Sequence, residues 1–307
     1  MLAGRALARL DSLRRTALLQ GMNYRHAYHA GNFADVLKHA VLALVIEHLK
    51  QKPAPFRIVD THAGTGLYDL TGGAAQKTGE WRHGIGRIWG ETLPGPVADI
   101  LAPYLGAIAA ENEDGKLERY PGSPRLARHL LRRGDTLVAN ELHPDDCASL
   151  KSLFARDGQT KVLELDGWDA VKSLLPPKER RGTILIDPPF EEPREFERLV
   201  EALANAARRF ATGTVLLWYP IKEERAAARF RRECGKLGLA KLFSAELLIR
   251  AANNPGELAG TGLVILNPPF TLHEKLAVLL PFLALKLGQG HGAASNLTWL
   301  SETVKSS

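Results

Sequence analysis

The amino-acid sequence predicts an α/β fold built on a mostly parallel sheet of seven strands, with helices on both faces. Apolar segments of strand length alternate with helical segments over most of the chain, as in sheets whose strands are joined by crossover helices. The first strand runs directly into a turn with two glycines, Gly64-Thr65-Gly66, as in nucleotide-binding α/β folds. Acidic residues follow several of the strands.

The composition is that of an ordinary soluble globular protein. Of 307 residues, 45% are apolar and 24% charged, which excludes wholesale disorder and a fibrous repeat. The longest clean apolar segment, Leu276 to Leu285, is half as long as a membrane span of about 20 residues, and Pro281 interrupts it. Two cysteines, Cys147 and Cys234, are too few for a disulfide framework or a cysteine-rich metal site. We therefore expect a cytoplasmic protein with no membrane partner.

Half of the net charge of +6 lies in a short N-terminal segment. Residues 1 to 21 contain four arginines against Asp11 alone. This segment is either a transit peptide or a stretch upstream of a true start at Met22, and we favour the second interpretation. We expect it to pack against nothing, and we expect one domain from residue 22 to residue 307. The rest of the chain is only mildly basic, so any RNA surface must be a local patch.

Helical and strand patterns can be followed in order from Met22. Apolar residues recur at helical spacing from Phe33 to Lys50, and a short strand covers Phe56 to Asp60. Between residues 68 and 122 we predict no buried strand but an inserted, mainly helical subdomain. After it the alternation of strand and helix resumes. The other predicted strands are 136–140, 161–165, 183–186, 214–219, 240–249 and 262–266, and the clearest later helices are 125–133, 195–210 and 223–237.

Acidic residues end four of the predicted strands. They are Asp60, Glu141, Asp166 and Asp187. The carboxyl ends of parallel strands meet at one edge of a sheet, and ligands of such folds bind there. Asp and Glu are also common wherever a strand turns into a loop, which is the structural alternative for any one of them. Their combination with the glycine turn favours a ligand site.

The glycine turn favours S-adenosylmethionine over a nicotinamide cofactor. Glycine lets the backbone approach a ligand closely, but the third glycine of the dinucleotide motif is missing after Gly66. S-adenosylmethionine has no pyrophosphate, has an amino-acid portion that the turn can hold, and offers ribose hydroxyls to Glu141. Asp166-Gly167 can accept a hydrogen bond from its adenine amine.

The most specific chemical signal is the segment Asp187-Pro188-Pro189-Phe190, which follows a buried strand. An exocyclic amine of a nucleobase is a poor nucleophile, because its lone pair is delocalised into the ring. The Asp187 carboxylate and the Pro188 carbonyl can accept hydrogen bonds from both amine protons and favour the pyramidal nitrogen that attacks a sulfonium methyl. The prolines stiffen the loop, and Phe190 offers a ring on which the base can stack. The segment therefore predicts methyl transfer in which the loop acts by holding the amine in position for the attack.

A second Pro-Pro-Phe segment provides an internal comparison. Asn267-Pro268-Pro269-Phe270 also follows an apolar strand, the seventh that we predict. We expect that edge of the sheet to be too distant to share a pocket with Asp60 and Glu141. We therefore interpret this segment as a structural turn whose prolines end a strand.

The histidines of the N-terminal half lack a cysteine or carboxylate that would complete a recognisable ligand set, so we expect no metal. His39 has two interpretations: a contact with Asp35 on its own helix, or a place beside Lys38 over the cofactor. The histidines considered are His26, His29, His39 and His62.

Ten basic side chains are candidates for contacts with RNA phosphates. For four of them, which lie on one predicted helix, a solvated helix face is the favoured interpretation. Those four are Arg225, Arg229, Arg231 and Arg232, and the other six are Arg25, Lys38, Arg125, Arg128, Arg132 and Arg133.

Together these segments closely resemble the bacterial 23S rRNA adenine-N6 methyltransferase J family, over nearly the whole chain from Met22. The N-terminal motif is more specific than the Asp-Pro-Pro-aromatic signature alone. The matching segments are Tyr24-Arg25-His26, His29-Ala30-Gly31-Asn32, Ala34-Asp35-Val36-Leu37-Lys38-His39, Asp60-Thr61-His62-Ala63-Gly64, Tyr120-Pro121-Gly122-Ser123-Pro124, Glu141-Leu142-His143-Pro144, Asp166-Gly167 and Asp187-Pro188-Pro189-Phe190.

The resemblance implies a class I methyltransferase (Rossmann-like) fold with an antiparallel seventh strand and a small helical insertion. It implies that Asp187 is catalytic and that Tyr24 meets the substrate RNA, to which the loop chemistry adds Pro188 and Phe190. Phe190 stands where tyrosine is common in the family, which removes a hydroxyl but keeps the ring, so we expect activity to be retained. Residues 1 to 21 have no counterpart. The positions that match the family's cofactor site are His39, His62, Ser123, Glu141, Asp166, Gly167 and Asp187.

The expected function is transfer of a methyl group from S-adenosylmethionine to the N6 amine of one adenine in 23S rRNA, with the base turned out of its stack. Methylation of a guanine N2 amine in rRNA, or of adenine N6 in DNA, would use the same loop. A third hypothesis is a non-catalytic RNA-binding assembly factor. The sequence argues against it, because every strand end has a polar side chain that could serve the site. We expect a monomer that acts on naked or partly assembled 23S rRNA.

Overall fold

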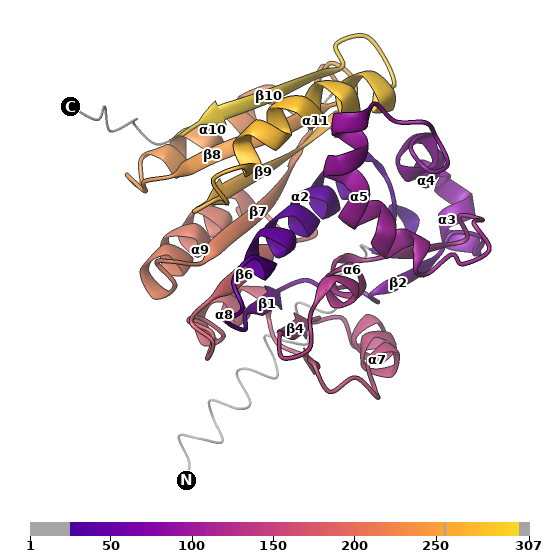
Figure 1. Cartoon of the computed structure of the whole chain (residues 1–307). Helices are drawn as coiled ribbons and strands as arrows, with labels where there is room; N and C mark the ends of the chain where they lie inside the picture. The colour runs from indigo at the N-terminus through magenta and orange to yellow at the C-terminus, as the bar shows by residue number, and fades with distance from the viewer. Residues whose placement is uncertain (1–24, 255, 301–307) are drawn as a thin grey trace.

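A sheet of eight strands lies at the centre of the computed structural model, which describes residues 25–254 and 256–300 (Figure 1). Its strand order is β10-β8-β9-β7-β6-β1-β4-β5. The five strands from β7 to β5 are parallel, β9 is antiparallel to β7 and β8, and β10 is antiparallel to β8. The bounds are Arg57–Asp60 (β1), Thr136–Asn140 (β4), Thr160–Leu163 (β5), Gly182–Ile186 (β6), Thr214–Ile221 (β7), Leu242–Leu248 (β8), Gly260–Leu266 (β9) and Ala294–Trp299 (β10).

This sheet confirms the predicted mostly parallel α/β fold, with one strand more than the seven expected. The additional strand is β10, which pairs with β8 at the edge of the sheet. Its side chains are exposed or half-buried and include Ser295, Asn296 and Thr298. An edge strand of this kind lacks the apolar run by which buried strands are recognised. The antiparallel seventh strand that the resemblance implies is β9.

Helices cover both faces of the sheet (Figure 1). Successive side chains of a strand point to opposite faces, so in β1 Ile58 joins the core beneath α2, α5, α6 and α11, whereas Val59 joins the core beneath α8, α9 and α10. No helix in residues 25–254 and 256–300 is long and apolar enough to cross a bilayer. The bounds are Phe33–Lys50 (α2), Gly95–Ala109 (α5), Ser123–Leu130 (α6), Pro144–Leu153 (α7), Gly167–Ser173 (α8), Glu195–Arg209 (α9), Glu224–Gly235 (α10) and Leu272–Leu287 (α11).

The segment between β1 and α6 contains short helices and a two-stranded sheet. In that small sheet β2 (Leu67–Asp69) is antiparallel to β3 (Arg119–Pro121). The sequence pattern predicted no strand here, because three residues are too few to show a period-2 pattern. Between the two strands lie α5 and three shorter helices: α3 (Gly73–Thr78), α4 (Glu80–His83) and the 3₁₀ helix η2 (Ile85–Arg87).

The helix α2 has the predicted bounds and lies almost entirely in the interior, with 15 of its 18 residues buried. It begins where the Asn32 side chain accepts hydrogen bonds from the backbone N–H groups of Ala34 and Asp35, at 2.9 and 3.1 Å. At the other end Arg132 and Arg181 donate hydrogen bonds to carbonyls of the last turn and the following loop. The segment before it contains the 3₁₀ helix η1 (His26–Tyr28).

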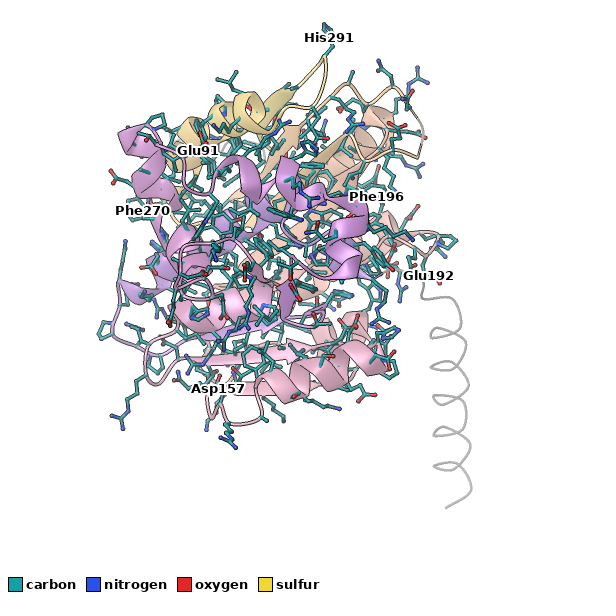
Figure 2. The ribbon with its side chains drawn as sticks, turned by 90° about the vertical axis from the view of Figure 1, so that its right-hand side faces the viewer. Glu91, Asp157, Glu192, Phe196, Phe270 and His291 are labelled. Atoms are coloured by element: carbon teal, nitrogen blue, oxygen red, sulfur yellow. The ribbon has the colours of Figure 1, made fainter. Side chains whose placement is uncertain are left out.

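The direction of β9 decides where the second Pro-Pro-Phe segment lies. We predicted that this segment lies at a distant edge of the sheet and for that reason cannot share the pocket. The distance was predicted wrongly, because β9 pairs directly with β7. Since β9 runs opposite to β6, it ends at the amino edge of the parallel strands, whereas the Asp187 loop lies at their carboxyl edge. There the Asn267 side chain donates hydrogen bonds to the carbonyls of Ala211 and Gly213, and Phe270 is 78% exposed. Figure 2 shows Phe270 and Glu192, which follows the Asp187 loop, on opposite sides of the molecule.

Candidate active site

A cavity of about 560 Å³ opens at the carboxyl edge of the parallel strands. Its size suits a nucleoside-sized ligand. Tyr24, the expected RNA contact, lies outside the described residues, and Asp60 lies buried beneath the lining. Every other predicted site residue lines the cavity: His39, His62, Ser123, Glu141, Asp166, Gly167, Asp187, Pro188 and Phe190.

The turn after β1 is fastened to the end of β4 by Glu141. One Glu141 carboxylate oxygen accepts a hydrogen bond from the Gly64 N–H at 2.8 Å, and the other accepts one from the His143 N–H at 2.7 Å. Each oxygen retains a second lone pair for a ligand. Burial raises the pKa of Glu141. Gly64 has a φ of +60°, and a Cβ there would lie 2.2 Å from the Tyr68 hydroxyl, so the turn requires glycine.

Asp166 caps a helix rather than ending a strand as predicted, because β5 stops three residues earlier. Its Oδ1 accepts a hydrogen bond from the Trp168 N–H at 2.7 Å, at the start of α8. The neighbouring Gly167 faces His62 so closely that a Cβ would lie 2.2 Å from the imidazole Nε2. Burial lowers the pKa of His62 to about 3, so this ring is neutral, and it is hydrogen bonded to the Thr61 hydroxyl at 2.8 Å.

Asp60 ends β1 as predicted and is 1% exposed. Its Oδ1 accepts a hydrogen bond from the His62 N–H at 3.3 Å. Burial raises the pKa of Asp60 to about 7, and the nearby Ser123 hydroxyl opposes that shift only in part. Ser123, at the start of α6, lines the cavity and forms a hydrogen bond with the buried carboxyl group.

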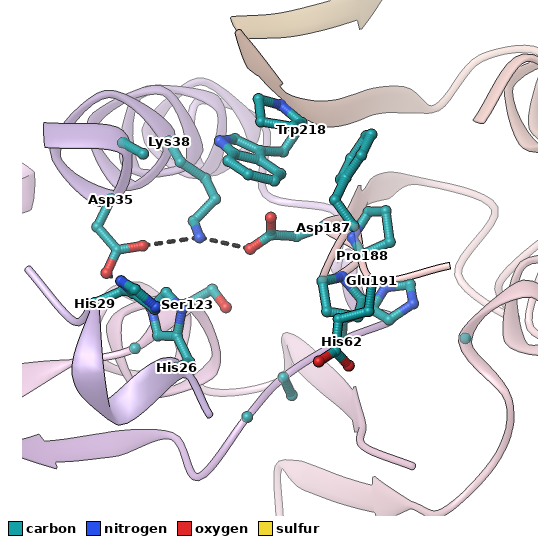
Figure 3. A pocket seen from close by; sticks show the side chains of 18 of the residues that line it. His26, His29, Asp35, Lys38, His62, Ser123, Asp187, Pro188, Glu191 and Trp218 are labelled. Carbon is teal, nitrogen blue, oxygen red and sulfur yellow. Dashed lines mark hydrogen bonds and ion pairs between the residues drawn. The ribbon is translucent and has the colours of Figure 1, made fainter. Parts of the chain in front are cut away.

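Lys38 joins α2 to the Asp187 loop (Figure 3). Its Nζ lies 2.8 Å from Asp35 Oδ1 and 2.5 Å from Asp187 Oδ2, and its side chain is 4% exposed. Burial lowers the pKa of Lys38, but Asp187 and Asp35 outweigh this effect and hold the pKa above its ordinary value. Lys38 was predicted as a phosphate contact; these two ion pairs place it inside the protein instead.

Asp35 is the buried anion behind Lys38. Its Oδ2 accepts hydrogen bonds from the Gly31 N–H and from His26 Nε2, both at 2.9 Å. Burial raises the pKa of Asp35, but His26 and Lys38 together lower it well below its ordinary value. Asp35 is therefore charged at neutral pH and fixes the direction of Lys38. The motifs alone did not reveal this role, for which the only sequence signal is the spacing of Asp35 and Lys38 by three residues on one helix.

His39 is a buried neutral side chain on the wall of the cavity. Its Nδ1 is hydrogen bonded to the Tyr120 hydroxyl at 2.8 Å, and its Nε2 lies 3.9 Å from Asp35. Burial lowers the pKa of His39 to about 3. Both interpretations of His39 thus fit its position, because it lies near Asp35 and also lines the cavity.

Two aromatic residues form the wall beside Asp187. Phe190 has a φ of +56°, and its ring contacts Phe196 and Trp218 edge-on at 5.0 and 5.7 Å between centroids. Trp218, near the end of β7, donates a hydrogen bond to the Thr261 hydroxyl at 2.7 Å and lines the cavity. Trp218 was not among the predicted site residues, although its place near the carboxyl end of a predicted strand was a usable signal.

The candidate phosphate contacts divide into two groups. Six form ion pairs within the described chain, which gives each of them a structural contact. These six, with their partners, are Arg25 with Asp146, Lys38 with Asp187, Arg125 with Glu111, Arg128 with Asp157, Arg132 with Asp135 and Arg231 with Glu246. The four without an ion-pair partner in the described chain are Arg133, Arg225, Arg229 and Arg232.

Two of the histidines that line the cavity, His26 and His29, are engaged by carboxylates. His26 contacts Asp35, and His29 is hydrogen bonded to Glu80 of α4 at 2.9 Å. The hydrogen bond with Glu80 raises the pKa of His29. Within residues 25–254 and 256–300, no three His, Cys, Asp or Glu side chains are grouped so as to hold a metal ion.

Comparison with known proteins places this site in a family. The family model described as ribosomal RNA large subunit methyltransferase D, RlmJ, matches residues 53–301. The chain belongs to this family. It is 41% identical over 278 residues to the ribosomal RNA large subunit methyltransferase J of Escherichia coli K12, covering 89% of this chain and 98% of that protein. The protein of the same name from Haemophilus influenzae is 39% identical over 282 residues, covering 91% and 99%.

A solved structure with the same fold agrees with this assignment. The protein LPL1258 of Legionella pneumophila superimposes with a TM-score of 0.80 at 33% identity, covering 90% of this chain and 99% of that one. The resemblance to the RlmJ family that the motifs indicate is therefore confirmed, and so is the methyltransferase fold.

Proposed function

We propose that this member of the RlmJ family transfers a methyl group from S-adenosylmethionine to the N6 amine of one adenine in 23S rRNA. The relatives that are 41% and 39% identical are named ribosomal RNA large subunit methyltransferases. One observation carries the proposal: the glycine turn after β1 and the Asp187-Pro188 loop after β6 open into the same cavity. A methyl donor and an acceptor amine could thus be held side by side.

The residues present fit S-adenosylmethionine, which supplies an electrophilic sulfonium methyl group when it is bound. Gly64 and Gly167 keep the cavity open where a Cβ would collide with Tyr68 or His62. Glu141 would accept hydrogen bonds from ribose hydroxyls with the lone pairs that its two backbone donors leave. Asp166 caps α8 with Oδ1, and its Oδ2, which lies 3.9 Å from a guanidinium nitrogen of Arg198, would accept a hydrogen bond from the adenine amine.

Asp187 and Pro188 would hold the acceptor amine. Lys38 engages Oδ2 of Asp187, and Oδ1 forms no hydrogen bond within the described chain. One amine proton would bond to Oδ1 and the other to the Pro188 carbonyl. Because the ion pair with Lys38 fixes the carboxylate before the base arrives, little reorganisation is needed for the attack.

The substitution Asp187→Asn tests this function. It keeps the size of the side chain but weakens both the acceptor and the ion pair with Lys38. We expect methylation of transcribed 23S rRNA by the purified protein, followed by nucleoside mass spectrometry, to slow by at least about 100-fold. Binding of S-adenosylhomocysteine, measured by calorimetry, should be nearly unchanged. Methylation at the wild-type rate would contradict the proposed role of Asp187.

Nucleoside analysis of a deletion strain separates the alternatives. Loss of one N6-methyladenosine from 23S rRNA supports the proposal, whereas loss of an N2-methylguanosine or of N6-methyladenine from DNA would replace it. Absence of S-adenosylhomocysteine binding by the wild-type protein would favour an RNA-binding factor without catalysis.

A further inference from the structure

Three unpaired arginines form a row on one face of α10. Arg225, Arg229 and Arg232 stand at positions i, i+4 and i+7, so their side chains share a helix face. All three are exposed, and none forms an ion pair within residues 25–254 and 256–300. We call these three residues the arginine row.

The carboxylates of the same helix are engaged by other cations. Arg231, on a different face, binds Glu224 at 3.0 Å and also the buried Glu246 of β8. Glu233 pairs with Lys236 at 2.8 Å. Glu233 also lies near enough to Arg229 and Arg232 for these two charges to help lower its pKa. One carboxylate that is shared with Lys236 offsets only part of the charge of three guanidinium groups, so the row keeps a net positive charge. An ordinary solvated helix face more often alternates charges that neutralise one another.

The arginine row begins at the mouth of the cavity. The helix α10 follows β7 almost directly, and Pro220 near the end of β7 and Lys222 of the connecting segment line the cavity. Arg225 comes three residues after Lys222. At 1.5 Å per helical residue, the row extends about 10 Å away from that mouth. The two residues between β7 and α10, Lys222 and Glu223, have opposite formal charges and add no net charge there.

We propose that the arginine row binds the phosphates of the nucleotides that flank the target base. This inference rests on the proposed function, since a base held in the cavity leaves its own backbone at the mouth. The phosphates next to it must then cross the surrounding surface, and guanidinium groups suit them because they offer paired N–H donors. Only mild positive charge is spread over the chain beyond residue 21, so RNA contact needs such a local patch.

Arg133 supplies a matched control. It is also an exposed arginine without an ion-pair partner among the described residues. It lies just before β4, however, at the amino edge of the parallel strands and away from the cavity. A general effect of lost positive charge would appear in Arg133→Ala, whereas a specific RNA contact would not.

The test compares the triple variant Arg225→Ala/Arg229→Ala/Arg232→Ala with Arg133→Ala and the wild type. Binding of transcribed 23S rRNA is measured over a series of salt concentrations. Three lost phosphate contacts should reduce the slope of log K against log salt by about 2, and KM for RNA should rise about tenfold or more. The maximal rate at saturating RNA and the binding of S-adenosylhomocysteine should stay unchanged, because these arginines do not line the cavity.

A second triple variant, with lysine at the same three positions, keeps the charge and should restore most of the salt slope. Equal slopes for the alanine triple variant and Arg133→Ala would overturn the inference and make the arginine row a solvated face. A wild-type protein that binds 23S rRNA through these arginines but methylates none of it would instead contradict the proposed function.

Discussion

Two buried carboxyl groups at the site, Asp35 and Asp60, have pKa values that are shifted in opposite directions. Asp35 and Asp187 share the ammonium group of Lys38, so burial of these charges is compensated. Asp60 is buried with no cation in contact among the described residues, and its pKa is raised to about 7. Lys38 forms ion pairs with Asp35 and Asp187, whereas it acts on Asp60 without contact and lowers that pKa too little to offset the effect of burial.

The raised pKa of Asp60 predicts how stability changes with pH. An unfolded aspartate titrates near 3.8, so between about pH 4 and pH 7 the folded protein binds more protons at this site than the unfolded chain. The contribution of Asp60 to the free energy of unfolding is therefore largest below pH 4 and falls as the pH rises to 7. Asp60→Asn removes this dependence. Urea denaturation of both proteins across that range should show the variant gaining stability relative to the wild type.

The close approach of His62 to Gly167 predicts that only glycine is compatible with cofactor binding there. An added Cβ would lie 2.2 Å from the imidazole, which must then shift, and both residues line the cavity. We expect Gly167→Ala to weaken S-adenosylhomocysteine binding by about tenfold or more, measured by calorimetry. The control is Gly158→Ala, where an added Cβ meets no atom within 4 Å. Equal affinity of the two variants would show that His62 does not limit this part of the cavity.

At the scale of elements, α2 combines a buried helix with a buried charged cluster. Most of its residues are apolar and lie in the core, yet Asp35, Lys38 and His39 are each 3% exposed or less. Buried charges are tolerated when they are paired and hydrogen bonded, and here the partners come from the preceding loop, from β3 and from the Asp187 loop. The helix thus connects the core directly to the candidate catalytic group.

The start of α2 depends on the Asn32 cap. Asn32→Ala removes the acceptor for two backbone N–H groups and the hydrogen bond from its side-chain amide to Glu80. We expect a loss of about 1 to 2 kcal/mol in the free energy of unfolding, measured by urea denaturation. Asn32→Ser, which keeps a capping oxygen, should lose less. An alanine variant as stable as the wild type would mean that packing alone holds this end of the helix.

At the scale of the whole molecule, strand direction distinguishes two segments with nearly the same letters. The Asp187 loop follows a strand that runs toward the cavity, and the Asn267 turn follows one that runs away from it. Phe190 accordingly lines the cavity among aromatic neighbours, whereas Phe270 is 78% exposed at the opposite edge. Two nearly identical segments therefore differ in position: one lines the cavity and the other lies at the opposite edge of the sheet.

Alanine substitutions at the two phenylalanines test this difference. Phe190→Ala should lower kcat/KM for 23S rRNA by about tenfold or more, because stacking on an aromatic ring is worth roughly 1–3 kcal/mol per base. Phe270→Ala should leave kcat/KM within about twofold of the wild type. The measurement is a methylation assay of both variants, with S-adenosylhomocysteine binding as a check on folding. Similar losses in both would contradict the assignment of the Asn267 segment as a structural turn.

The sequence by itself determined the elements whose signals are local. The apolar spacing of Phe33 to Lys50 predicted α2 at its observed bounds, and the strand patterns predicted the parallel part of the sheet. The strand-end acids and the Asp187 loop predicted which edge holds the cavity, because all parallel strands end on the same side. Short or polar strands such as β2, β3 and β10 lacked a readable period.

Only the tertiary structure decided how the polar side chains are paired. Lys38 and Asp187 are 149 residues apart in sequence, and nothing in the spacing of either predicts their ion pair. The same holds for Glu141 with the Gly64 N–H, and for the arginines that the fold leaves unpaired on α10 within the described chain. The physical reason is that periodicity reports which face of an element is buried, whereas the partner across that face depends on how the elements pack.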